Sequence, residues 1–230
     1  MPENFLFAPG PIATITFNRP ERRNCLTREV LVELDDLLVR VGDDDDTRVL
    51  ILTGTGAAFC AGADISGGKD LPDSTERMKN FAREIKGFPR LNARALETLM
   101  RLDALTIAAV NGFAVGGGWG LAGATDFVFA AEGAEFWIPE IALGIPFLGL
   151  QTEILARGAG QWLAKEIMIV GRHFTAEELL RLGMVNCVVK REQLISATHD
   201  FAQKLLTLPK RAAIATKHAI NGIFAGPRQS

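Results

Sequence analysis

Short apolar segments alternate with amphipathic ones along the first half of the chain. Residues 12–17 form a β-prone run, and residues 27–41 carry apolar side chains at helical spacing, with Thr27 placed as a helix N-cap. Four aspartates at 43–46 precede an apolar run over 49–52, and we interpret these aspartates as a solvated turn. The pattern predicts a strand, a helix and a second strand in succession.

The alternation of strand and helix continues into the second half. Loops are predicted over 53–69 and 111–118, and a helical segment interrupted near Gly87 and Pro89 reaches about residue 102. Further strands are predicted over 106–110, 127–131, 135–137 and 184–189. Most of the later pattern is helical and ends in a helix over 209–224. Strands separated by helices favour an α/β fold.

The composition indicates which class of binding partner to expect. With 48% hydrophobic residues, 23% charged residues and a formal net charge of −2, the 230-residue chain has the balance of a globular protein. Nothing in it indicates a nucleic-acid surface or a polybasic membrane contact, so a small-molecule partner is expected. The chain start lacks the pattern of a signal peptide, and no stretch reaches about 18 uninterrupted apolar residues. We expect a soluble, cytoplasmic protein.

The cysteines and histidines do not indicate a metal site or a nucleophile. Cys25, Cys60 and Cys187 form no CxxC pair, and we interpret them as reduced thiols. The histidines at 173, 199 and 218 are accompanied by no GxSxG or HExxH pattern. No metal is predicted.

Two glycine-rich loops carry the candidate chemistry. Residues 59–65 and 111–118 each follow a predicted strand, and their small side chains leave backbone amides accessible. The second loop leads into a helix, whose first amides favour negative charge. Either loop alone could be a simple tight turn. Two amides that converge on one oxygen would stabilise the charge that develops when a thioester is enolised.

Four segments together resemble the crotonase, or enoyl-CoA hydratase/isomerase, family. They are FNRPERRNCL, AFCAGADI, NGFAVGGG and FWIPEIALGI, and the likeness extends from about residue 5 to about residue 220. The resemblance implies a spiral of ββα turns over 1–190 and a helical trimerisation region over 191–230 that is short for the family. It also implies a homotrimer or homohexamer that acts on an acyl-CoA, with coenzyme A as part of the substrate and no separate cofactor.

The same resemblance assigns roles to individual residues. The amides of Ala63 and Gly117 would hold the thioester oxygen, and Glu140 would be the acid/base group. A set of neighbouring residues would line the substrate path: Arg23, Cys25, Ala61, Asp64, Ile65, Gly116, Trp119 and Pro139. Arg23 would reach a CoA phosphate, and Trp137 is a further candidate to shape acyl specificity together with Trp119.

Two departures from the family pattern bear on the reaction. Hydratases of the family carry a second glutamate where this chain has Gly120, and the glycine-rich segment after the first glutamate is the apolar run 146–150 here. Because one base can move a proton between two carbons, a single Glu140 favours isomerisation of an enoyl-CoA over hydration. A hydratase with an atypical site and a non-catalytic acyl-CoA-binding relative remain alternatives.

One further motif points to another class of protein. Residues 118–123 match GxGxxG, the fingerprint of a dinucleotide-binding unit. Only three residues separate its last glycine from the next predicted strand, which is too few for the crossover helix of such a unit. We therefore prefer the acyl-CoA interpretation.

Overall fold

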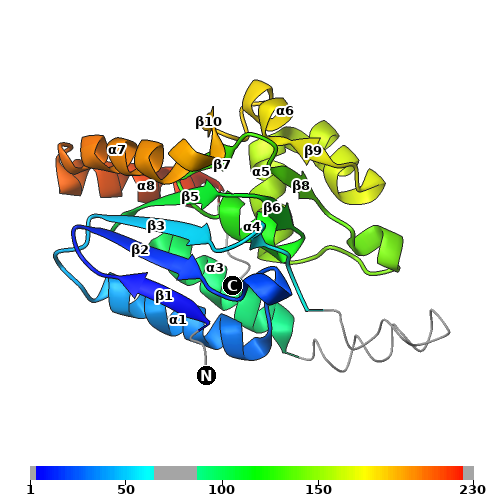
Figure 1. The fold of residues 1–230 in the computed structure, drawn as a ribbon, viewed down its shortest axis with the longest axis horizontal. Coiled ribbons are helices and arrows are strands. Elements are labelled where there is room, and N and C mark those ends of the chain that lie inside the picture. Colours follow the sequence, from blue (N-terminus) through cyan, green and yellow to red (C-terminus); the bar gives the residue numbers. More distant parts are fainter. Residues whose placement is uncertain (1–3, 65–86, 225–230) are drawn as a thin grey trace.

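The computed structural model describes residues 4–64 and 87–224, and a six-stranded sheet forms its centre (Figure 1). The strands lie in the order β1, β2, β3, β5, β7, β10. Only β1 is antiparallel to its neighbour β2, and the other pairs are parallel. The strands are β1 (Phe5–Ala8), β2 (Ile12–Phe17), β3 (Val49–Gly54), β5 (Leu105–Val110), β7 (Phe127–Ala131) and β10 (Cys187–Val189).

A second, four-stranded sheet has the order β4, β6, β8, β9. Its members are β4 (Ala58–Cys60), β6 (Phe113–Val115), β8 (Glu135–Trp137) and β9 (Phe174–Thr175). The first three are parallel, and β9 runs antiparallel to β8. Three consecutive strand pairs along the chain, β3 with β4, β5 with β6 and β7 with β8, each give one strand to each sheet. This is the expected spiral of ββα turns.

Four short strands differ from the sequence prediction. The strands β4 and β6 lie inside segments that were predicted as loops, and β1 and β9 were not predicted. None of the four exceeds four residues, so their side-chain alternation is too short to recognise.

Helices cover both faces of the larger sheet (Figure 1). The pair α1 and α3 lies on one face, and α7 and α8 lie on the other. The helices are α1 (Arg28–Gly42), α3 (Phe88–Arg101), α4 (Gly117–Gly123), α5 (Leu150–Lys165), α6 (Ala176–Arg181), α7 (Leu194–Leu206) and α8 (Lys210–Phe224). Short 3-10 helices occur at η1 (Pro20–Arg22), η3 (Glu140–Leu143) and η5 (Arg191–Gln193), and a π-helical turn occurs at η4 (Glu166–Val170).

Successive side chains of β3 point to opposite faces of the larger sheet, so this strand contributes to two apolar clusters. Leu50 and Leu52 belong to the apolar cluster that includes α1, whereas Val49 and Ile51 belong to the cluster that includes α7. Helix α1 begins where the sequence predicts, because the Thr27 hydroxyl accepts a hydrogen bond from the Val30 amide at 3.3 Å. The packing of α7 against the sheet ties the C-terminal helices to the core, and the division at residue 190 stays a prediction.

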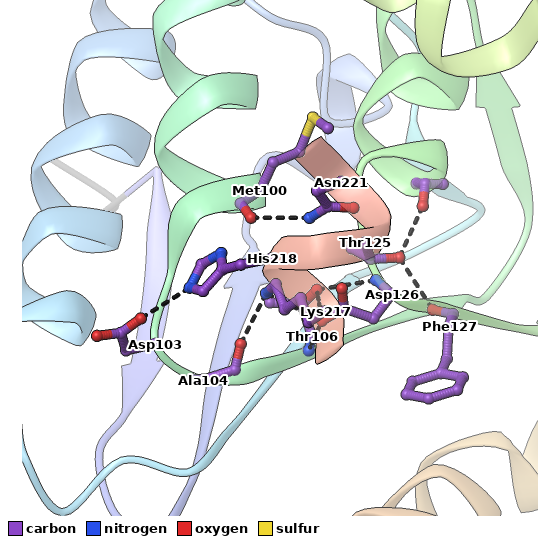
Figure 2. Close-up of polar contacts among 11 residues, drawn as sticks. Met100, Asp103, Ala104, Thr106, Thr125, Asp126, Phe127, Lys217, His218 and Asn221 are labelled. Carbon is purple, nitrogen blue, oxygen red and sulfur yellow. Dashed lines mark hydrogen bonds and ion pairs between the residues drawn. The ribbon is translucent and has the colours of Figure 1, made fainter. Parts of the chain in front are cut away.

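A buried ion pair anchors α8 to the sheet (Figure 2). Lys217 Nζ lies 3.0 Å from Asp126 Oδ2 and donates to the Ala104 carbonyl at 2.7 Å. Asp126 Oδ2 also accepts from the amide and the hydroxyl of Thr106. Burial lowers the pKa of Lys217, and the charge of Asp126 opposes that shift. Two further contacts, His218 to Asp103 and Asn221 to the Met100 carbonyl, bind α8 to the end of α3 and the segment after it.

No helix in the described ranges is long and apolar enough to cross a membrane.

Candidate active site

Three parallel strands of the smaller sheet end at the same edge and deliver the candidate residues there. Residues 61–64 follow β4, Gly116 follows β6, and Pro139 and Glu140 come shortly after β8. Parallel pairing of β4 with β6 and of β6 with β8 places these chain segments side by side. The sheet therefore brings the two glycine-rich loops and the glutamate together.

The two loops approach each other more closely than side chains would allow. A Cβ atom on Gly62 would lie 2.5 Å from the Val115 carbonyl oxygen and 3.3 Å from the Gly117 nitrogen, and the φ angle of Gly62 is +76°. A Cβ atom on Gly118 would overlap the carbonyl oxygen of Cys60. Glycine at these positions is what lets the segment before Ala63 lie against the start of α4.

The backbone geometry leaves the two predicted amides available. The Leu26 amide donates to the Gly62 carbonyl at 2.7 Å, and the Asp64 amide donates to the Leu26 carbonyl at 2.9 Å. In this parallel bridge the amide of the intervening Ala63 points away from Leu26. Gly117 is the first residue of α4, where helical geometry provides no acceptor for the amide. Neither amide has an acceptor among residues 4–64 and 87–224, so both can donate to an external oxygen.

Glu140 lies directly against the start of α4. A Cβ atom on Gly116 would overlap Glu140 Oε1, so the close approach requires glycine, and the φ angle of Gly116 is +50°. Glu140 Oε2 is buried and has no hydrogen-bond partner in the described part of the chain. Burial raises the pKa of Glu140 to about 7. A carboxyl group with this pKa can give or take a proton near neutral pH.

These groups surround a cavity of about 240 Å³. Ala61, Ala63 and Gly116 line it together with Pro139 and Glu140. Arg23, whose side chain is exposed, lies at the same cavity. The structure thus gathers six of the predicted site residues around one space, with Gly117 beside them.

Three further predicted residues do not line this cavity, namely Cys25, Asp64 and Trp119. Cys25 is buried, and its thiol lies 3.4 Å from Asp64 Oδ2, which also forms an ion pair with Arg22 at 2.8 Å. Burial is the main reason why the pKa of Cys25 is raised. Neither Cys25 nor Asp64 lines the cavity. Ile65 lies outside the described residues.

Trp119 requires a correction. Its side chain is 3% exposed and packs against Phe136 and Phe174, with ring centroids 5.6 and 6.0 Å away. It points into the core because it lies on the side of α4 that faces the smaller sheet, so it does not line the cavity with Glu140. Trp137 does line that cavity, and it stacks on His173 with ring centroids 4.4 Å apart.

Several cavity residues were not predicted. Phe113 and Val115 alternate along β6 and face the cavity, so the period-2 pattern would have found them if the strand had been recognised. Leu143 and Ile145 come from η3 and the residues after it. They give the cavity an apolar wall. Within the described ranges, no cluster of three or more His, Cys, Asp or Glu could hold a metal ion.

The two interleaved sheets, and the loops that meet beside Glu140, define a protein of the crotonase fold. A model of the enoyl-CoA hydratase/isomerase family matches residues 8–228, and the chain belongs to this family. It is 36% identical to the short-chain-enoyl-CoA hydratase of Clostridium acetobutylicum over 92% of this chain and 78% of that protein. The crotonyl-CoA hydratase of Syntrophomonas wolfei is also 36% identical, over 91% of this chain and 78% of that protein.

Solved structures resemble the whole described fold. The enoyl-CoA hydratase of Bacillus anthracis superposes with a TM-score of 0.83 and 32% identity, over 95% of this chain and 83% of that one. A monofunctional enoyl-CoA isomerase of Mycobacterium smegmatis gives a TM-score of 0.80 and 30% identity, over 98% of this chain and 96% of that one. Hydratases and an isomerase are therefore similarly close in fold.

Proposed function

We propose that this chain is an acyl-CoA enzyme that moves a proton to or from carbon in an enoyl thioester. The amides of Ala63 and Gly117 hold the enolate oxygen, and Glu140 is the acid/base group. The observation that carries the proposal is Glu140 Oε2, which is buried beside the start of α4 and has no hydrogen-bond partner among the described residues. A carboxyl group buried without a partner is costly, and such groups concentrate at functional sites.

The favoured reaction is isomerisation of an enoyl-CoA. Glu140 removes a proton from C2 of a 3-enoyl thioester, the electrons pass into the enolate held by the two amides, and the proton returns to C4. This gives the conjugated 2-enoyl isomer with no change in composition. The absence of a carboxylate at Gly120 supports a one-base reaction. Each oxyanion donor of this kind typically contributes on the order of 100- to 1000-fold in rate.

The rest of the site fits a CoA thioester. Arg23 lies at the cavity rim with an exposed side chain, where it can meet a phosphate of the nucleotide. Phe113 and Trp137 form an apolar wall for the acyl part. A homotrimer or homohexamer remains our prediction for the assembly.

Hydration is the second candidate. The relatives in Clostridium and Syntrophomonas are named hydratases, and both align over most of this chain. Without a carboxylate at residue 120, hydration needs another polar group to orient the water molecule.

The two reactions can be separated in one assay. Purified protein is incubated with 3-enoyl-CoA and with 2-enoyl-CoA in deuterated water, and the products are resolved by chromatography and mass. Conversion of the 3-enoyl substrate to the conjugated isomer faster than 3-hydroxyacyl-CoA forms supports the proposal. Predominant hydration would replace isomerisation as the main activity. No conversion of either substrate would refute the proposed proton transfer.

A further inference from the structure

A pair of side-chain amides lies beside the start of α4, on a different side from Glu140. Asn92 of α3 is 4% exposed, and its Nδ2 donates to Gln151 Oε1 of α5 at 2.8 Å. A Cβ atom on Gly117 would lie 3.8 Å from Gln151 Oε1 and 4.0 Å from Asn92 Oδ1. The neighbouring Gly116 faces Glu140 more closely, since a Cβ atom there would overlap Glu140 Oε1. The amide pair and Glu140 thus approach the same helix start from two directions.

Gln151 also occupies the space beside Gly120. A Cβ atom there would lie 2.9 Å from Gln151 Cβ and 3.4 Å from Gln151 Oε1. A side chain at residue 120 and the present position of Gln151 are therefore incompatible. The polar group that this chain places beside that turn of α4 is a neutral amide from another helix.

The contact between Gln151 and the Leu148 carbonyl determines how the side-chain amides of Gln151 and Asn92 are oriented. Gln151 Nε2 donates to the Leu148 carbonyl at 3.3 Å, so Gln151 Oε1 must face Asn92. Asn92 must then present Nδ2 to Gln151 and turn Oδ1 away. Asn92 Oδ1 is buried and has no hydrogen-bond partner among residues 4–64 and 87–224. The chain of hydrogen bonds therefore ends in an unused acceptor beside Gly117.

We propose that Asn92 Oδ1 accepts a hydrogen bond from a water molecule, and that Asn92 and Gln151 are positioning residues for hydration. This inference rests on the proposed function, since it uses the same thioester and the same Glu140. A buried acceptor without a partner needs a donor, and a water molecule is the smallest one available. The amide cannot take the proton of the water molecule, so it orients the oxygen and leaves all proton transfer to Glu140.

The hydration step balances with these groups alone. The water oxygen bonds to C3 of the 2-enoyl thioester while Glu140 takes one of its protons. The π electrons of the C2–C3 bond move into the enolate held by Ala63 and Gly117. Glu140 then delivers the proton to C2, which gives the 3-hydroxyacyl thioester and restores the carboxylate. Hydration is expected to be slower than isomerisation but measurable, because one carboxylate performs both transfers.

The test is the ratio of hydration to isomerisation in matched variants. Asn92→Leu keeps the volume and removes the acceptor, so hydration should fall at least about 10-fold relative to isomerisation, in line with the loss of one polar contact in the transition state. Gln151→Leu should lower the ratio by about 3-fold, and it should have no further effect in the Asn92→Leu background, because Gln151 acts through Asn92. Thr98→Val, on the same helix and bonded to Asp35, is the control and should leave the ratio unchanged.

Each other result has a definite meaning. Equal losses of both reactions in Asn92→Leu, with a lower melting temperature, would make the pair purely structural. A raised KM for both substrates with an unchanged ratio would mean that Asn92 binds the thioester itself. Isomerisation without any hydration by the unmodified protein would also overturn the water site. Absence of both isomerisation and hydration with every substrate would instead refute the proposed function.

Discussion

Replacing Glu140 by glutamine is expected to abolish activity and to stabilise the fold at alkaline pH. The substitution keeps the shape of the side chain and removes its charge. Loss of the acid/base group should reduce turnover by at least about 100-fold. The effect on stability follows from burial, because the buried carboxyl group is charged at pH 8 and the glutamine is not.

The size of the stability effect can be worked from the pKa. Burial raises the pKa of Glu140 from 4.5 to about 7 in the folded protein. Below pH 4.5 the group is protonated in both the folded and the unfolded chain, and burial costs little. Between pH 4.5 and 7 the unfolded chain loses the proton while the folded chain keeps it, so the folded state becomes less favourable as pH rises. The full cost above pH 7 is about 3 kcal/mol, because each pKa unit corresponds to about 1.4 kcal/mol.

Urea denaturation of both proteins at pH 4 and pH 8 measures this cost. The free energy of unfolding of Glu140→Gln, relative to the unmodified protein, should rise by about 3 kcal/mol between these two pH values. Glu97→Gln, on an exposed position of α3, is the control, and its relative stability should change little with pH. A pH-independent difference for Glu140→Gln would mean that the carboxyl group is not protonated at neutral pH, and the argument from burial would fail.

Four further results are expected. The kcat/KM for isomerisation should rise about tenfold between pH 6 and pH 8 with a midpoint near 7, since the base must be deprotonated, and a flat profile in steady-state assays would contradict the assignment of Glu140. Gly116→Ala should lower kcat at least about 100-fold in the same assay, because the added methyl group overlaps the carboxylate. Lys217→Met should lower the free energy of unfolding in urea by about 3 kcal/mol, because it removes the cation from a half-buried Asp126 that keeps only its hydrogen bonds from Thr106. Thr27→Ala should cost about 1 kcal/mol in the same measurement through loss of the N-cap.

The sequence predicts the long elements of the fold well. Helix α1 and strand β2 lie where their patterns indicate, since α1 has many apolar positions at one spacing and a capping threonine, and β2 alternates buried and half-buried positions over six residues. The two short strands β4 and β6 were missed because each has only three residues and lies inside a glycine-rich segment that was predicted as a loop. Their pairing comes from contacts between distant segments, which local pattern does not record.

The site was predicted through its glycines more than through its side chains. The close approach of Gly62 and Gly116 explains why small residues occur there, so the two loops and Glu140 could be placed together from the motifs. Trp119 was misplaced because proximity in sequence to a loop does not determine which side of α4 a residue occupies. Its burial against Phe136 depends on the smaller sheet.

The amide pair shows what a comparison of aligned positions cannot detect. Considered within α4 alone, Gly120 indicates that the second glutamate of the family hydratases has been lost. That interpretation favours an isomerase with one base. In the folded chain Gln151, thirty-one residues later, lies against the same glycine and is held by Asn92 from a third helix. The glycine and the glutamine depend on each other, since a larger residue at 120 would displace the amide. A missing side chain at an active site is therefore evidence about chemistry only after the group that occupies its space has been identified.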